Sequence, residues 1–127
     1  MLVVLVACGG GKPAVTPPAP TVDTAALAAE LDAEQSELAL ILHHDRDRCP
    51  DMAARMKLLW HRMRTTFARA HELQNDPALA KQLTTDLKRY DAVAATRTQR
   101  MNADLTTAAP CVRDPAVVDA LMTMPTL

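Results

Sequence analysis

Side chains able to bind a metal gather in one short segment, residues 43–47, which reads His-His-Asp-Arg-Asp. If this segment is helical, His43 and Asp47 stand four residues apart on one face, with His44 beside them, and could bind Zn²⁺ or Cu²⁺. His61 would add a ligand only if its helix brought it to the same height. The alternative is a helix C-terminus whose cations complement the helix dipole and whose carboxylates are solvated. We favour this alternative and predict no metal site, with His43, His44 and Asp47 kept as the weaker hypothesis.

Seven methionines raise a second possibility, haem or copper, because periplasmic helical proteins use Met and His as ligands. The chain has no Cys-x-x-Cys-His motif for covalent haem attachment. Met52, Met56 and Met63 recur at the spacing of one helix face, which favours methionine as an adaptable core side chain. We therefore predict no cofactor. A small periplasmic metal- or haem-binding helical protein remains the alternative function.

Motifs of enzymes are missing from the sequence. It contains no His-Glu-x-x-His, no Gly-x-Ser-x-Gly and no glycine-rich loop placed to bind phosphate. The formal net charge is −1, so nothing drives the chain as a whole toward nucleic acid. We predict a protein that is not an enzyme and has no small-molecule substrate and no nucleic-acid partner.

The first eight residues carry a targeting pattern. An apolar stretch, residues 1–7, precedes Cys8, and Leu5-Val6-Ala7-Cys8 resembles the lipobox of bacterial lipoproteins. In that family a diacylglycerol is attached to the cysteine thiol, and the signal peptide is cut just before it. The apolar region is short and no Lys or Arg precedes it. We therefore interpret residues 1–7 as a signal-peptide remnant whose true start lies further upstream, and Cys8 as the lipidated residue.

A tether is predicted next, over residues 8–22. Residues 9–20 contain three Gly, four Pro and one charged side chain, a composition that stays extended and packs no core. The residue after the cysteine is Gly9 rather than Asp, which by resemblance favours the outer membrane. The resemblance thus implies a lipid-anchored protein of the bacterial cell envelope, on the periplasmic face of the outer membrane.

Residues 23–127 have the apolar periodicity of helices. Caps and prolines predict four of them: from Asp23 or Thr24 to about Asp47, from Cys49-Pro50 to about Asn75, from Asp76-Pro77 to just before Pro110, and from Ala116 to about Met124. Connections this short force neighbouring helices to be antiparallel. The predicted fold is therefore all-α, an antiparallel three-helix bundle with a short fourth C-terminal helix and a flexible N-terminal tether.

Two cysteines lie in this helical domain. Cys49 is at the start of the second predicted helix and Cys111 is just beyond the end of the third, and those ends meet in an antiparallel hairpin. Export to the envelope would permit oxidation, and Cys8 is accounted for by the lipid. We predict a Cys49–Cys111 disulfide, which two lone cysteines without a Cys-x-x-Cys motif favour over a metal site.

The second predicted helix is basic, with Arg55, Arg62 and Arg69 spaced seven residues apart, and the first is acidic. The basic face could bind an anionic envelope component or an acidic protein, but charge complementarity between the two helices is the interpretation we favour. Trp60, expected to be half-buried, is the best candidate for an interface anchor by residue type. The leading hypothesis is a membrane-anchored, non-enzymatic helical interaction module with an unidentified protein or envelope partner.

Overall fold

A computed structural model describes residues 22–107 and 109–127 of the chain. The predicted signal-peptide remnant, Cys8 and all but the last residue of the predicted tether therefore lie outside the described residues. Every element within the described ranges is a helix, so the fold class is all-α, as the sequence predicts. None of these helices is both long and apolar enough to cross a membrane.

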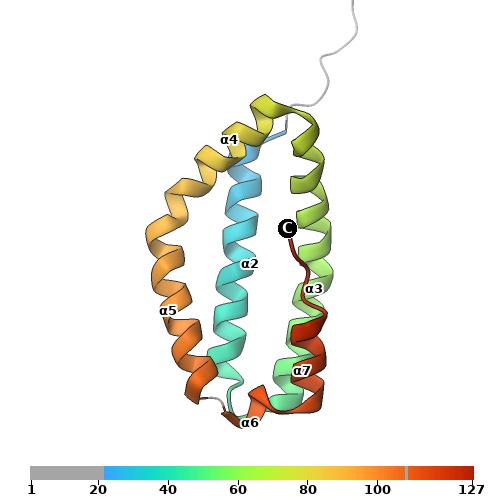
Figure 1. Ribbon diagram of the computed structural model, residues 1–127, viewed down its shortest axis with the longest axis vertical. Coiled ribbons are helices and arrows are strands. Elements are labelled where there is room, and N and C mark those ends of the chain that lie inside the picture. The colour runs from blue at the N-terminus through green and yellow to red at the C-terminus, as the bar shows by residue number, and fades with distance from the viewer. Residues whose placement is uncertain (1–21, 108) are drawn as a thin grey trace, which may run out of the picture.

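The helices begin and end close to the positions that caps and prolines predict (Figure 1). Asp23, Asp76 and Asp114 each accept a hydrogen bond from a backbone N–H of the turn that follows, and a proline opens the helix after the last two. The elements are α2 Thr24–His44, α3 Cys49–Glu72, η1 Leu73–Asn75, α4 Pro77–Leu87, η2 Lys88–Tyr90, α5 Asp91–Thr107, α6 Ala109–Val112 and α7 Pro115–Met122.

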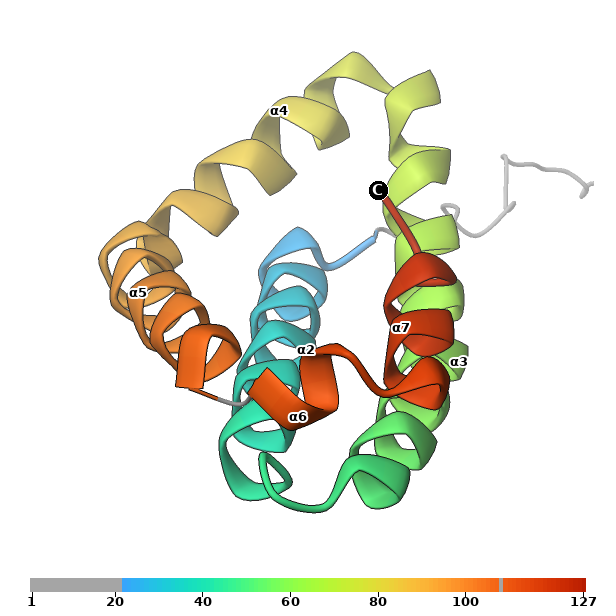
Figure 2. The ribbon, with the colours of Figure 1, turned by 60° about the horizontal axis from the view of Figure 1, so that its bottom comes forward.

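Helix α2 is the centre of the packing. It contacts α3 on one side and α4 and α5 on the other, whereas α7 packs along α3 (Figures 1 and 2). The α6 segment crosses the lower end of the molecule and connects α5 to α7. The helices are thus arranged around α2 and do not share their contacts equally.

The third predicted helix is bent in the structure. It divides at the 3-10 turn η2 into α4 and α5, and α5 has no fully buried residue. A 3-10 turn changes the rotation per residue, so the segments on its two sides can each direct their apolar side chains toward α2. Leu83 of α4 packs near the start of α2, while Met101 and Leu105 of α5 pack near its end.

The core consists of two apolar clusters along α2. The larger one includes Met52, Met56 and Met63, each at most 1% exposed, which confirms that these methionines are core side chains. The smaller one joins the first turns of α2 to the end of α3 and to α4. Phe67 packs against both clusters and connects them.

Three boundaries differ from the prediction. Helix α2 ends at His44, and Asp47 lies in the turn that follows. The last helix ends at Met122, and the short helix α6 surrounds Pro110, where the sequence predicts only a helix end. The first difference matters for the site, because it removes the four-residue helical spacing between His43 and Asp47.

Candidate functional site

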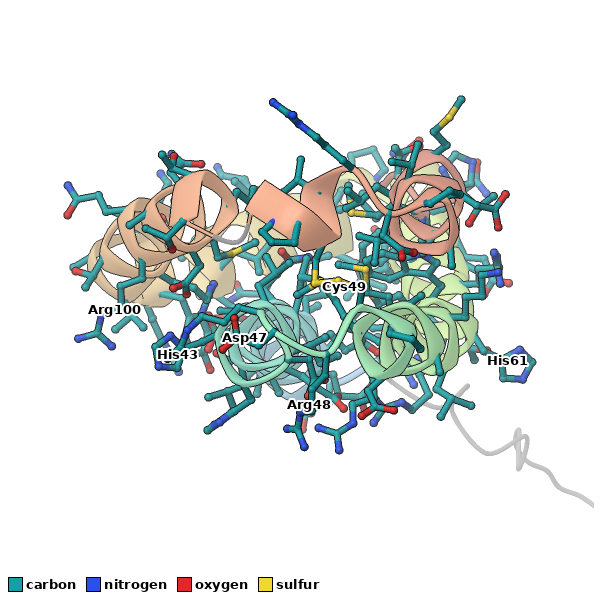
Figure 3. All side chains as sticks on the ribbon, turned by 90° about the horizontal axis from the view of Figure 1, so that it is seen from below. His43, Asp47, Arg48, Cys49, His61 and Arg100 are labelled. Atoms are coloured by element: carbon teal, nitrogen blue, oxygen red, sulfur yellow. A yellow bond between two sulfur atoms is a disulfide. The ribbon has the colours of Figure 1, made fainter. Side chains whose placement is uncertain are left out.

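The two cysteines of the helical domain lie at disulfide distance. Cys49 is the first residue of α3 and Cys111 lies in α6, with their Cα atoms 4.9 Å apart and their sulfurs 2.16 Å apart (Figure 3). The pairing is the one that the ends of the predicted helices require. It joins the start of α3 to a segment 62 residues later in the chain.

The residues of the weaker metal hypothesis do not converge. His43 directs its Nδ1 toward Oδ1 of Asp104 on α5, 3.2 Å away, and Asp47 lies beyond the end of α2. His61 lies on the opposite side of the molecule from His43 (Figure 3). Within residues 22–107 and 109–127, no group of three or more His, Cys, Asp or Glu side chains is placed to hold a metal ion.

The three evenly spaced arginines of α3 are paired with acidic residues of α2 or of the turn that follows it. Arg62 contacts Glu37 at 2.5 Å, Arg69 contacts Glu30 at 2.7 Å, and Arg55 contacts Asp45 at 3.3 Å. This is the charge complementarity between helices that the sequence favours. The side chains of the Arg62–Glu37 and Arg69–Glu30 pairs are about half-exposed, so each of these two surface pairs contributes little to stability, whereas Asp45 is buried.

Trp60 is not half-buried, and its predicted role as an interface anchor is wrong for this structure. The side chain is 1% exposed, and its indole N–H donates a 2.7 Å hydrogen bond to the carbonyl oxygen of Ala120 in α7. The short C-terminal helix α7 covers this part of α3. The periodicity of α3 shows which face of α3 is apolar, but it does not show that α7 lies against that face. Trp60 thus anchors α7 within the chain.

Replacing Trp60 with phenylalanine is expected to lower the free energy of unfolding by about 1–2 kcal/mol, because a buried hydrogen bond to α7 is lost while most of the apolar volume remains. Urea unfolding followed by circular dichroism measures the change. The matched control is Leu58→Ala on the same helix, whose side chain is 69% exposed and whose removal is expected to have little effect. Equal losses from the two substitutions would contradict the role of Trp60 in holding α7.

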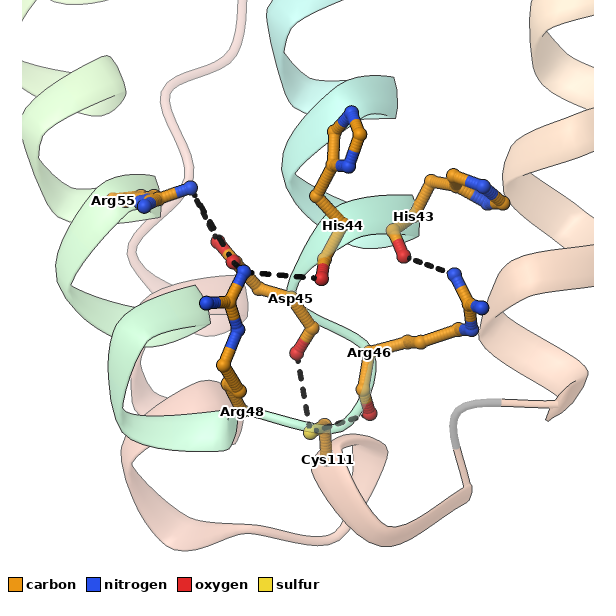
Figure 4. Close-up of polar contacts among 7 residues, drawn as sticks. All are labelled: His43, His44, Asp45, Arg46, Arg48, Arg55 and Cys111. Carbon is orange, nitrogen blue, oxygen red and sulfur yellow. Dashed lines mark hydrogen bonds and ion pairs between the residues drawn. The ribbon is translucent and has the colours of Figure 1, made fainter.

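A buried carboxylate just after α2 is the polar centre of the lower end of the molecule (Figure 4). Asp45 is 0% exposed, and its Oδ1 lies 3.0 Å from Arg48 and 3.3 Å from Arg55. Its backbone carbonyl lies 3.8 Å from the Cys111 sulfur, and the carbonyl of Arg46 lies 3.0 Å from that same sulfur. Because a disulfide sulfur carries no hydrogen, these two are packing contacts in the oxidised protein. Asp45 therefore connects the end of α2, the start of α3 and the disulfide.

A second buried carboxylate lies at the other end of α2. Asp86 of α4 is 3% exposed and accepts hydrogen bonds from the Thr24 hydroxyl at 2.6 Å and from the Gln82 amide at 3.1 Å. Sequence reasoning missed both buried acids. The signal was present in the periodicity, since Asp45 follows Leu38 and Ile41, and Asp86 follows Leu83, at the spacing of the apolar face.

A groove follows the line where α2 and α5 meet. Its volume is about 870 Å³, and its lining comes from these two helices alone. The apolar part consists mainly of alanines together with Leu40 and Val93, whose side chains are 55% and 57% exposed. The charged and polar part includes Arg97, Arg100 and the His43–Asp104 pair. The sequence alone does not predict this groove, because the groove depends on the bend at η2 that turns α5 along α2.

No protein-family model, curated protein sequence or solved structure matches this chain. The function must therefore be argued from the chain itself. The described residues form a helical domain crosslinked by a disulfide, with an open groove that carries Arg97 and Arg100. These features are suited to binding.

Proposed function

We propose that the chain is a lipid-anchored lipoprotein of the bacterial envelope whose helical domain is a non-enzymatic interaction module. The anchor is the thiol of Cys8, and residues 9–22 are the tether that lets the domain reach past the lipid headgroups. We further propose that α4 and α5 together act as the third helix of a three-helix bundle, with α7 as its short fourth helix.

One observation carries this proposal: the three cysteines divide into a pair and a single residue. Cys49 and Cys111 lie at disulfide distance, which is typical of proteins in an oxidising compartment. Cys8 follows an apolar segment that ends in Ala7, the position at which an exported lipoprotein is acylated. The pair thus supports export by an argument independent of the lipobox resemblance.

The interaction role is supported by the charged and apolar side chains on the surface of the helices. Two acidic residues of α2, Glu30 and Glu37, are paired with Arg69 and Arg62 of α3. Exposed apolar side chains on α2, α3 and α5, such as Leu40, Leu58 and Val93, are available to a partner. Such a surface binds by contact and needs no reacting group.

The test is the intact mass of protein expressed in a bacterium with its native upstream codons, recorded with and without a reducing agent. The expected product begins at Cys8, carries acyl chains, and gains about two daltons on reduction because one disulfide opens. Expression of Cys8→Ser provides the control and should give an unacylated product.

Two results would overturn the proposal. One is an unacylated wild-type chain that retains residues 1–7, and the other is a chain with three free thiols when isolated under conditions that block thiol exchange. An acylated chain with a closed disulfide supports the anchor and the compartment together.

A further inference from the structure

The groove between α2 and α5 has the dimensions of a binding site for a helix. Its residues on α5 run from Ala92 to Asp104, twelve residues apart, or about 18 Å of helix. On both helices the lining residues recur every three or four positions, so the groove follows one face of each helix along its length. A partner helix of about three turns would fill this length.

One wall of the groove is fixed by a largely buried ion pair. Arg97 of α5 contacts Oδ1 of Asp32 at 2.8 Å and Oγ of Ser36 at 2.9 Å, and its side chain is 12% exposed. A charge pair with so little exposure is held in one geometry and keeps α5 at its distance from α2. The groove is therefore a preformed feature of the helix pair.

The charge along the groove is unbalanced. Arg97 is neutralised by Asp32, and Asp104 is occupied by His43. Arg100 has no acidic side chain within 4 Å among the residues that the structure describes, and it lies on the same side of the molecule as His43 (Figure 3). An occupant with a carboxylate would supply the partner that Arg100 lacks.

We infer that this groove docks an acidic amphipathic helix of a partner protein, with apolar side chains seated against Leu40 and Val93 and a carboxylate on Arg100. The inference rests on the proposed function in taking the domain to be an interaction module. Two other occupants fit less well. A small molecule is usually buried over most of its surface, whereas Leu40 and Val93 line a trough that is open to solvent. A second copy placed symmetrically would bring Arg100 against a groove whose own carboxylate, Asp104, is already paired with His43.

The probe is a fluorescein-labelled helical peptide of about 14 residues, with leucines at the first, fifth and eighth positions of one face and glutamates beside them. A matched peptide carries lysines in place of the glutamates. The protein is the full chain with Cys8→Ser, which removes the acylated thiol. Fluorescence anisotropy is expected to show binding of the acidic peptide and at least tenfold weaker binding of the basic one.

Variants of the groove make the test specific. Leu40→Glu is expected to weaken binding of the acidic peptide at least tenfold. Val93→Glu is a second variant should the first fail to fold. Arg100→Glu is expected to weaken binding of the acidic peptide about fivefold and to improve binding of the basic peptide. Misfolding cannot produce such a change of preference. The controls are Arg64→Glu on α3 and Met122→Glu on α7, both exposed and outside the groove, which should leave binding unchanged.

Three results would overturn the inference: neither peptide binds, both bind equally, or Arg100→Glu leaves the preference unchanged. Light scattering that shows a dimer abolished by both Leu40→Glu and Val93→Glu would assign the groove to a second copy and would also overturn the inference. Because the protein used carries no lipid, these results are independent of the mass measurement. If the wild-type chain is acylated but the groove does not bind the peptide, the docking site alone is refuted. If the groove binds the peptide but the wild-type chain is never acylated, the envelope proposal alone is refuted.

Discussion

Replacing Cys49 and Cys111 together with serine is expected to lower the free energy of unfolding by about 4 kcal/mol. The disulfide closes a loop with a sequence separation of 62, and in the chain-entropy model the cost of its removal rises with the logarithm of that length. A domain of this size has a total stability of about 5–15 kcal/mol, so the loss is about a quarter to four-fifths of the total. Urea unfolding of the oxidised protein and of the double variant, followed by circular dichroism, measures the difference.

Two controls separate the crosslink from local packing. A serine hydroxyl at position 111 can donate to the nearby Arg46 carbonyl, so the buried position keeps a polar partner and the loss reports mainly the missing crosslink. Adding a reducing agent to the wild type should reproduce the loss, and adding it to the double variant should change nothing. A double variant as stable as the oxidised wild type would show that the two thiols are not bonded in the native protein.

The ends of the helices could be predicted from the sequence because they depend on local chemistry. An aspartate followed by a proline satisfies the first backbone N–H groups and fixes the first helical residue, and this holds at Asp76 and Asp114 whatever packs around them. The pairing of Cys49 with Cys111 followed from the same boundaries. It required only that two antiparallel helices place their ends together.

The arrangement of the helices depends on tertiary contacts that periodicity does not contain. The apolar stripe continues from Leu83 through Leu87 to Met101, so nothing in the pattern marks the bend at η2. Likewise, the stripe of α3 shows which face is apolar but not that α7 covers Trp60. The groove between α2 and α5 follows from that bend, and it could be found only once the path of the chain was known.

The buried acids show a different limit. The sequence favours a solvated helix end for the segment containing Asp45, because its cations suit a helix C-terminus. Acidic residues are also rarely fully buried without partners. Its partners, Arg48 and Arg55, come from the next helix and its cap, so they compensate the charge only after the chain turns. A charged residue that continues an apolar stripe is therefore a candidate for one member of a buried ion pair.

Removing both arginines around Asp45, with Arg48→Ala and Arg55→Ala combined, is expected to lower the free energy of unfolding by about 3 kcal/mol. Each arginine is more than half exposed, so either single substitution should cost about 1 kcal/mol or less, as for a surface pair. The carboxylate between them is 0% exposed, and its Oδ2 already lacks a hydrogen-bond donor among the described residues. Losing both cations leaves this charge uncompensated, so the double loss should exceed the sum of the two single losses.

The matched control is the pair Arg62→Ala and Arg69→Ala, on the same helix and also paired with α2. Their partners Glu37 and Glu30 are exposed enough to be solvated, so this double loss should equal the sum of its parts and stay below about 2 kcal/mol. Adding Asp45→Asn to the first double variant should recover part of the stability, because the buried charge is then gone. Additive losses at both sites, or no recovery with Asp45→Asn, would show that Asp45 is as solvated as Glu30 and Glu37. If only the two arginines around Asp45 show a double loss greater than the sum of the single losses, the buried charge that the fold must compensate lies at the junction of α2, α3 and the disulfide.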